Sequence, residues 1–265
     1  NATFQYYSGY EVLDVSPSDV FTAAEFNWKQ AAVNVTASGL ETRIQNAGPE
    51  QVINLLDSRI RNAEKTMANN ISEGIYSDGT GSGGKQIGGL QSVVADAGTG
   101  TVGGINSTTF SFWQNVTSGD VAAISVSSDA LLDEMQDMWL ETMRGNDKCD
   151  LIVADQTFYK RFWDNLQDIQ RITTASEGVA GFQTLKFVTA DVVMDGGPSI
   201  KNSGIPALHM YFLNTDYLHF RVHSDTNFVP FEQKAPVNQD ALVVPILFAG
   251  NLTCSNRSLQ GVVYT

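Results

Sequence analysis

A single apolar stripe constrains the fold of this chain more than any other feature of its sequence. Apolar residues recur at steps of three and four, at Ile53, Leu56, Ile60, Ala63, Met67, Ile71 and Ile75. That spacing aligns them on one face of an α-helix. Pro49 is placed for a first turn, and the glycine-rich run at 79–84 ends the pattern. The stripe predicts a helix over 49–76, roughly 40 Å long at 1.5 Å per residue. Such a length suits the backbone of a plate-like subunit.

The segment ahead of this helix is rich in aromatic residues and has strand character. One extended stretch covers 4–15 and a second covers 21–36, with a turn signal at Ser16-Pro17-Ser18-Asp19 between them. This order predicts a β-hairpin carrying Phe4, Tyr6, Tyr7, Tyr10 and Phe21 ahead of Trp28. A two-stranded ribbon is only marginally stable in water by itself. The hairpin therefore packs either on its own domain or on a neighbouring subunit.

The rest of the chain alternates between helical and strand patterns. A loop region rich in Gly, Ser and Thr covers 77–109, with short strand pieces such as 90–94. One helix is predicted from Ser127 or Ser128, with an apolar face at Leu131, Leu132, Met135, Met138 and Trp139, and another around Phe158, Phe162 and Leu166. Strands are predicted at 150–154, 184–188, 191–194, 208–213, 217–222, 228–231, 241–249 and 261–264. Strands early, a helical middle and strands late indicate an α+β protein.

The charge of the chain limits its possible partners. The formal net charge is −13, and the basic residues are scattered, with Arg59 and Arg61 the densest pair. Proteins that read nucleic acid carry basic patches that displace counterions, so sequence-specific nucleic-acid binding is not expected. No apolar run approaches the ~20 residues that span a bilayer, and we expect no membrane partner. Cys149 and Cys254 are expected to be reduced, buried thiols. The chain begins at Asn1 instead of Met, which indicates a fragment or a processed product.

No group of residues in the sequence indicates catalysis. His219 and His223 share a predicted strand face about 13 Å apart, which is too far for one metal ion. The glycine-rich run ending at Lys85 follows a helix, and Gln86 stands where a phosphate loop needs a hydroxyl. Asp133, Glu134 and Asp137 read as a solvated helix face. We expect no enzyme activity, no catalytic residue, no cofactor and no metal site.

A series of short segments is informative when taken in chain order. The segments are Asn46-Ala47-Gly48-Pro49-Glu50, Ile87-Gly88-Gly89-Leu90, Thr101-Val102-Gly103-Gly104-Ile105, Phe112-Trp113-Gln114-Asn115, Asp168-Ile169-Gln170-Arg171, Gly181-Phe182-Gln183-Thr184-Leu185-Lys186-Phe187, Tyr211-Phe212-Leu213-Asn214-Thr215 and Gly250-Asn251-Leu252-Thr253. In this order they resemble the major capsid proteins of tailed bacteriophages and prophages, which have the Hong Kong 97-type fold. The resemblance covers nearly the whole chain.

The resemblance implies a domain organisation. Residues 1–45 would form the extended β-hairpin loop, and 46–125 the peripheral subdomain with its spine helix at 49–76. Residues 126–235 would form the axial α/β subdomain, and 236–265 the return strands of the peripheral subdomain. Members of the family carry an N-terminal arm ahead of the extended loop, whereas this chain starts close to the loop.

The resemblance also implies a function and partners. The protein would be a structural subunit that self-assembles into the hexamers and pentamers of an icosahedral capsid. The capsid would enclose double-stranded DNA, contacted without sequence specificity, and scaffolding or decoration proteins are further possible partners. The subunit would be made in the bacterial host cytoplasm and would end in the virion. Contacts between subunits are expected at Tyr6, Tyr7, Phe26, Trp28 and Lys29. Some relatives form Lys–Asn cross-links between subunits, and that chemistry is not carried over to Lys29.

Two other functions remain open at this stage. Asn-x-Ser/Thr sequons, which are glycan acceptors in exported eukaryotic proteins, favour an exported adhesin or surface-binding module. They occur at Asn1, Asn34, Asn70, Asn106, Asn115, Asn251 and Asn256. An acidic hydrolase is the third reading, because paired carboxylates are frequent in this chain. It would need a cleft that joins two of them.

Overall fold

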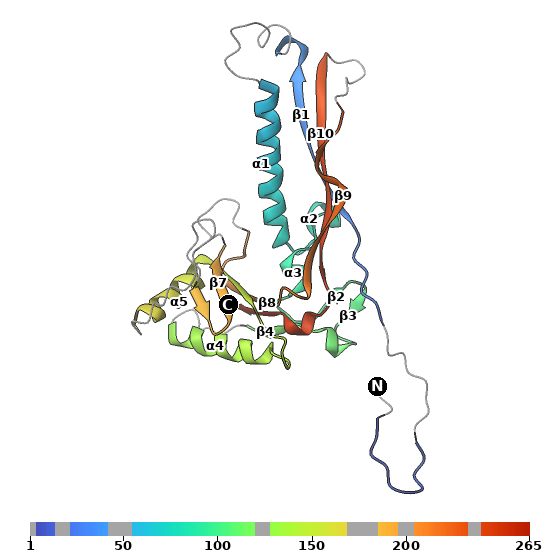
Figure 1. Ribbon diagram of the computed structural model, residues 1–265, viewed down its shortest axis with the longest axis vertical. Coiled ribbons are helices and arrows are strands. Elements are labelled where there is room, and N and C mark those ends of the chain that lie inside the picture. The colour runs from blue at the N-terminus through green and yellow to red at the C-terminus, as the bar shows by residue number, and fades with distance from the viewer. Residues whose placement is uncertain are drawn as a thin grey trace.

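The computed structural model describes residues 4–13, 22–41, 55–119, 128–168, 185–195, 204–232 and 240–265. They form an upright arm standing on a wider body, with the N-terminal segment projecting from the foot of the arm (Figure 1). The arm consists of α1 (Leu55–Ile75) and a sheet of β1 (Lys29–Ser38), β10 (Ala241–Cys254) and β9 (Leu218–Pro230). The body holds a six-stranded sheet with two helices on one face.

The arm is held together by one face of α1 packed on the sheet. Ala63, Met67 and Ile71 of the predicted stripe are buried against Ile246 and Phe248 of β10. The stripe is therefore confirmed along the described part of the helix, and the predicted start at 49–54 lies outside the described residues. The opposite face of α1 is exposed.

Strand β10 joins the arm to the body. It pairs antiparallel with β1 over Lys29–Ser38 and with β9 on its other side, where the register shifts near Phe248. At about 3.4 Å per residue its 14 residues span roughly 45 Å. Its first half contributes Ile246 to the arm core, and its last residues, Leu252 and Cys254, belong to a core of the body. The arm and the body therefore share a continuous strand.

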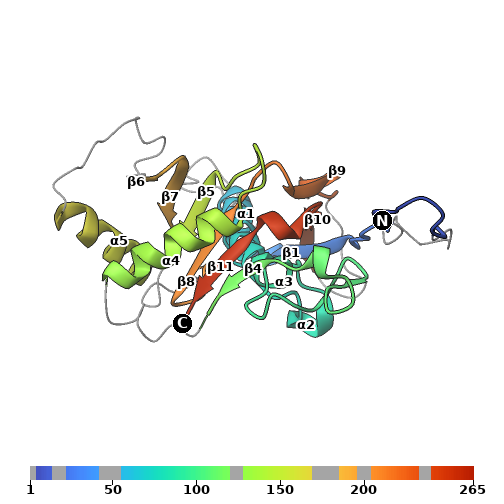
Figure 2. The ribbon, with the colours of Figure 1, turned by 90° about the horizontal axis from the view of Figure 1, so that it is seen from below.

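The body sheet has the order β4-β11-β8-β5-β7-β6. Its strands are β4 (Val116–Ser118), β5 (Leu151–Ala154), β6 (Leu185–Phe187), β7 (Ala190–Met194), β8 (His209–Leu213) and β11 (Gly261–Tyr264). Helices α4 (Ser128–Glu141) and α5 (Gln156–Asp168) lie side by side on one face (Figure 2). Side chains alternate along β8, so Met210 and Phe212 face the helices while Tyr211 and Leu213 face the second core.

The region between α1 and the body is a run of short elements: α2 (Gly81–Gly84), α3 (Leu90–Val93), β2 (Thr101–Val102), β3 (Ile105–Asn106) and η2 (Ser111–Trp113). Gly89 lies directly beneath the end of α1. A Cβ added there would come within 2.3 Å of the Ile75 carbonyl oxygen, so only glycine allows this approach. Gly89 of the sequence resemblance thus has a physical reason, the close approach of the start of α3 to the end of α1.

The structure corrects three sequence predictions. The N-terminal hairpin is wrong for the described residues, because 4–13 contains no strand and β1 pairs with β10 instead; the predicted turn at 16–19 lies outside them. Residues 90–93 are helical instead of extended. The strands predicted at 217–222 and 228–231 are one long strand, β9, because an exposed edge strand tolerates the polar residues between them.

Strand pairing crosses the domain boundaries drawn from the resemblance. Strand β9, which ends before the boundary at 235, pairs with β10, which follows it. Strand β11 lies in the body sheet between β4 and β8, although it belongs to the last predicted segment.

None of the helices within the described ranges is both long and apolar enough to cross a bilayer.

Candidate assembly surfaces

The N-terminal segment Phe4–Leu13 carries its aromatic residues into solvent. Tyr6 is 92% exposed and Tyr10 is 106% exposed, and Phe4, Tyr7, Val12 and Leu13 are exposed as well. Within the segment, Gln5 donates to the Val12 carbonyl, and the Ser8 amide donates to Glu11. Soluble monomers rarely display apolar side chains so densely. The exposure of Tyr6 and Tyr7 agrees with a role in contacts between molecules.

The segment 22–28, in contrast, is attached to its own chain. The Glu25 amide donates to the Gly103 carbonyl at 2.9 Å, and the Asn251 side chain donates to the Asn27 carbonyl at 2.8 Å. Gly103 has a positive φ of 59°, and a Cβ there would come within 2.9 Å of the Ala24 methyl. This glycine allows the segment to lie close to the β2–β3 turn.

The other predicted contact residues are partly satisfied within the chain. Phe26 is half-buried beside Gly103. Trp28 is 56% exposed and makes an edge-on contact with the His223 ring at 5.8 Å between centroids. Lys29 donates from Nζ to the Gly84 carbonyl. The structure therefore separates the five residues: Tyr6 and Tyr7 are free of the body, whereas Phe26, Trp28 and Lys29 lie on it.

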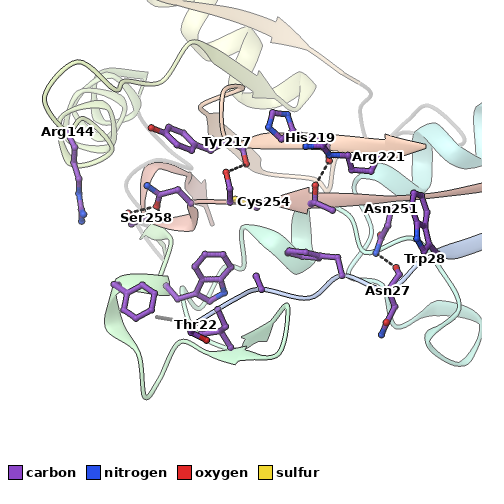
Figure 3. Close-up of a pocket in the computed structure, with 18 residues that line it drawn as sticks. Thr22, Asn27, Trp28, Arg144, Tyr217, His219, Arg221, Asn251, Cys254 and Ser258 are labelled. Carbon is purple, nitrogen blue, oxygen red and sulfur yellow. Dashed lines mark hydrogen bonds between the residues drawn. The ribbon is translucent and has the colours of Figure 1, made fainter. Parts of the chain in front are cut away.

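An open cleft of about 860 Å³ separates the segment 22–28 from the lower ends of β9 and β10 (Figure 3). Phe26 and Trp28 form one wall together with Phe112 and Trp113. The other wall consists mainly of residues from β9, β10 and the turn after β10. Its residues are Tyr217, His219, Arg221, Asn251, Thr253, Cys254, Ser255, Asn256 and Ser258.

The cleft is basic although the protein is acidic. Among the described residues, Arg144, His219 and Arg221 line it, and no Asp or Glu does. Both arginines are exposed, and neither guanidinium has a hydrogen bond or ion pair to another described residue. In a chain with a formal net charge of −13, two exposed arginines on one surface give this cleft a local positive potential.

A buried arginine holds the floor behind this cleft. Arg257, in η3 (Arg257–Leu259), is fully buried. It donates to the Val93 carbonyl at 2.6 Å, to the Trp113 carbonyl at 3.0 Å and to Asn115 Oδ1 at 2.7 Å. Burial lowers the pKa of Arg257 to about 10. The side chain fixes Trp113, and with it one wall of the cleft, to the end of β10.

The two thiols are buried, and the described residues bring no cluster of metal-binding side chains together. Cys149 and Cys254 are free and buried, as expected, and burial raises the pKa of their thiols to about 12 and about 11. A thiol that holds its proton so firmly is a poor nucleophile. No three His, Cys, Asp or Glu side chains of the described residues form a group suited to a metal ion.

Two sequons are incompatible with glycan attachment in the folded chain. Asn115 and Asn251 are 5% and 6% exposed. Asn115 donates to the Ala95 carbonyl and accepts from Arg257, and Asn251 Oδ1 accepts from the Gly88 amide. Both asparagines therefore hold neighbouring segments together by hydrogen bonds, a role that the sequon pattern does not indicate.

No protein-family model matches the chain, and no curated protein matches its sequence. The structure is similar to solved shells. The holo-SrpI encapsulin complex from Synechococcus elongatus matches with a TM-score of 0.57 at 10% identity, over 89% of this chain and 73% of that chain. The capsid of Myoviridae phage XM1 matches with a TM-score of 0.56 at 13% identity, over 89% and 73%. Mycobacterium phage Bobi matches with a TM-score of 0.54 at 11% identity, over 89% and 71%.

These similarities extend over most of both chains. The protein therefore has the fold of phage capsid and encapsulin shell proteins, which is the Hong Kong 97-type fold that its sequence resembles.

Proposed function

We propose that this protein is the structural subunit of an icosahedral bacteriophage capsid, which self-assembles into hexamers and pentamers around double-stranded DNA. The observation that carries the proposal is the segment Phe4–Leu13, whose aromatic side chains are exposed to solvent. Exposed apolar side chains gathered in this way are typical of surfaces that contact another molecule. The fold indicates that the partner is another copy of the chain, because the solved structures with similar folds are an encapsulin complex and a phage capsid.

We assign the arm to the peripheral subdomain and the body to the axial subdomain. Helix α1 would be the spine helix of the peripheral subdomain. Helices α4 and α5 would belong to the axial subdomain, which contacts neighbouring copies at the symmetry axes. The segment ahead of β1 would be the extended loop that lies on a neighbouring subunit. Many weak, symmetric contacts of this kind make assembly cooperative.

The acidic charge suits a container. A formal net charge of −13 on each copy repels both neighbouring copies and DNA phosphates. Apolar contact between subunits therefore has to exceed the repulsion, and the genome would be enclosed without tight or sequence-specific binding. We propose that the protein is not an enzyme and that it functions in the virion after synthesis in the bacterial host.

A second candidate is a shell that contains no genome. The encapsulin complex matches this chain as well as the phage capsid does, with TM-scores of 0.57 and 0.56. The adhesin reading has less support, because Asn115 and Asn251 are buried sequons. The hydrolase reading needs carboxylates in a cleft, and the lining of the cleft beside Trp28 includes none.

Electron microscopy of the purified full-length protein tests the proposal. Closed shells, or rings of five and six subunits, are expected, and DNA that resists added nuclease should copurify with particles from an infected or induced host. Closed shells without protected DNA would favour the genome-free container. A protein that sediments as a monomer at all concentrations up to the millimolar range would contradict both.

A further inference from the structure

We propose that the basic cleft beside Trp28 is the receptor for the aromatic segment Phe4–Leu13 of a second copy of this chain. This inference rests on the proposed shell function and adds to it the site at which one subunit holds the next. The segment of the same chain is not in the cleft, because the lining residues begin at Thr22 and the segment projects away from the body (Figure 1).

The walls of the cleft match an extended peptide with aromatic side chains. His219 and Arg221 share one face of β9, and Tyr217, which directly precedes the strand, continues the alternation. Thr253 of β10 is paired with His219, and Ser255 follows β10 beside Tyr217. Together they form a polar floor for a peptide backbone.

Aromatic side chains also line the cleft. Trp28 and Phe112 are both more than half exposed. Rings that enter the cleft can stack on them edge to face, in the geometry that aromatic pairs prefer. The volume of about 860 Å³ lies in the range of pockets that bury a drug-sized ligand. A few aromatic side chains of the segment fill it, and the rest of the segment lies outside.

Charge complementarity selects this occupant. The segment Phe4–Leu13 contains Glu11 and no Lys or Arg. The cleft shows the reverse pattern, with Arg144, His219 and Arg221 and no Asp or Glu among the described residues that line it. Most of the remaining surface of a protein with a net charge of −13 repels such a segment. Attraction between opposite patches steers association and fixes the register of the partners.

Charge reversal tests the pairing. Glu11→Lys alone and the pair Arg144→Glu with Arg221→Glu should each raise the protein concentration at which particles form, by about tenfold or more. The combination of all three changes should restore assembly to within about threefold of the wild type, because the charges are again opposite. Lys160→Glu, which changes the charge by the same amount per site as each arginine reversal and lies at an exposed position of α5, is the control and should have little effect. A triple variant no better than the worse parent overturns the proposal.

Photo-crosslinking from position 10 locates the segment directly. A photoreactive phenylalanine analogue replaces Tyr10 in the full-length protein, and particles are formed from a mixture of isotopically light and heavy copies. Crosslinks between light and heavy chains at Trp28, Phe112 or 217–221 are expected.

Crosslinks to the chain's own cleft, to α1 of another copy, to a different protein or to nucleic acid each overturn the assignment. Intact particles with crosslinks elsewhere reject this site while keeping the shell function. Absence of particles under all conditions rejects the shell function itself.

Discussion

Replacing the two most exposed tyrosines should weaken assembly without destabilising the isolated subunit. In the double variant Tyr6→Ala with Tyr10→Ala, two rings that are 92% and 106% exposed are lost. A packed aromatic side chain buries ~150–250 Å². If half of that is covered in the assembly, each ring contributes ~100 Å², or ~2.5 kcal/mol at ~25 cal/mol per Å². Because part of the area is offset by ordering of the loop, a total of about 3–5 kcal/mol is expected for the pair.

That free energy has a measurable consequence. The association constant for one loop contact should fall by roughly 150- to 5,000-fold, and the concentration at which particles appear in light scattering should rise accordingly. The stability of the isolated subunit should change by less than about 0.5 kcal/mol in urea denaturation, because the lost rings touch little of their own chain.

The matched control keeps the rings and removes only the hydroxyls. Tyr6→Phe with Tyr10→Phe should assemble within a few-fold of the wild type. The reasoning is refuted if the alanine variant assembles at the wild-type concentration, or if it loses several kcal/mol of subunit stability. In the first case the rings contact no neighbour, and in the second they belong to their own core.

Three further predictions concern stability and reactivity. Arg257→Met removes three buried hydrogen bonds and should lower the free energy of unfolding by about 3–5 kcal/mol; a loss below 1 kcal/mol in urea denaturation contradicts it. Hydrogen bonds from Arg59 lower the pKa of Glu41 from 4.5 to about 2, so this pair stabilises the arm above pH 4.5 and stops doing so as the pH falls toward 2. The protection factors of the β1 amides, taken relative to the intrinsic exchange rate at each pH, should fall across that window in the wild type and not in Glu41→Gln. Cys149 and Cys254 should resist an aromatic disulfide reagent at pH 8 until urea unfolds the chain; rapid labelling of the folded protein would show that burial does not protect them.

The helices could be predicted because their apolar faces repeat over several turns. Ala63, Met67 and Ile71 are buried on α1, and Leu131, Met135 and Met138 are buried on α4, as the periodicity indicates. The short run 90–93 was predicted as a strand, and it is a helical turn. Four apolar residues cannot distinguish the two periods, and the deciding contact, Gly89 beneath Ile75, is tertiary.

The sequence predicts where the strands lie better than it predicts which strands pair. β1 was expected to pair with the residues just before it, because hairpins join neighbours in sequence. Its partner is β10, more than two hundred residues later. The alternating burial of β1, which places Val35 and Ala37 inward, fits any apolar strand, so the sequence pattern did not specify which one.

The candidate site was predicted in part. The aromatic residues of the N-terminal segment can be recognised from the sequence because they have few apolar partners nearby in the chain, and Tyr6 and Tyr7 are exposed. The basic cleft gave no sequence signal. It brings together Thr22–Trp28, Phe112, Arg144 and 217–221, which are scattered along the chain, and only the fold places their charges on one surface.

A cryo-electron microscopy reconstruction of the assembled particles tests the central claim most directly. The account predicts an icosahedral shell in which density for residues 4–13 continues from the foot of one arm and ends against another copy. A reconstruction in which those residues fold back onto their own body, with the aromatic rings covered there, would contradict it.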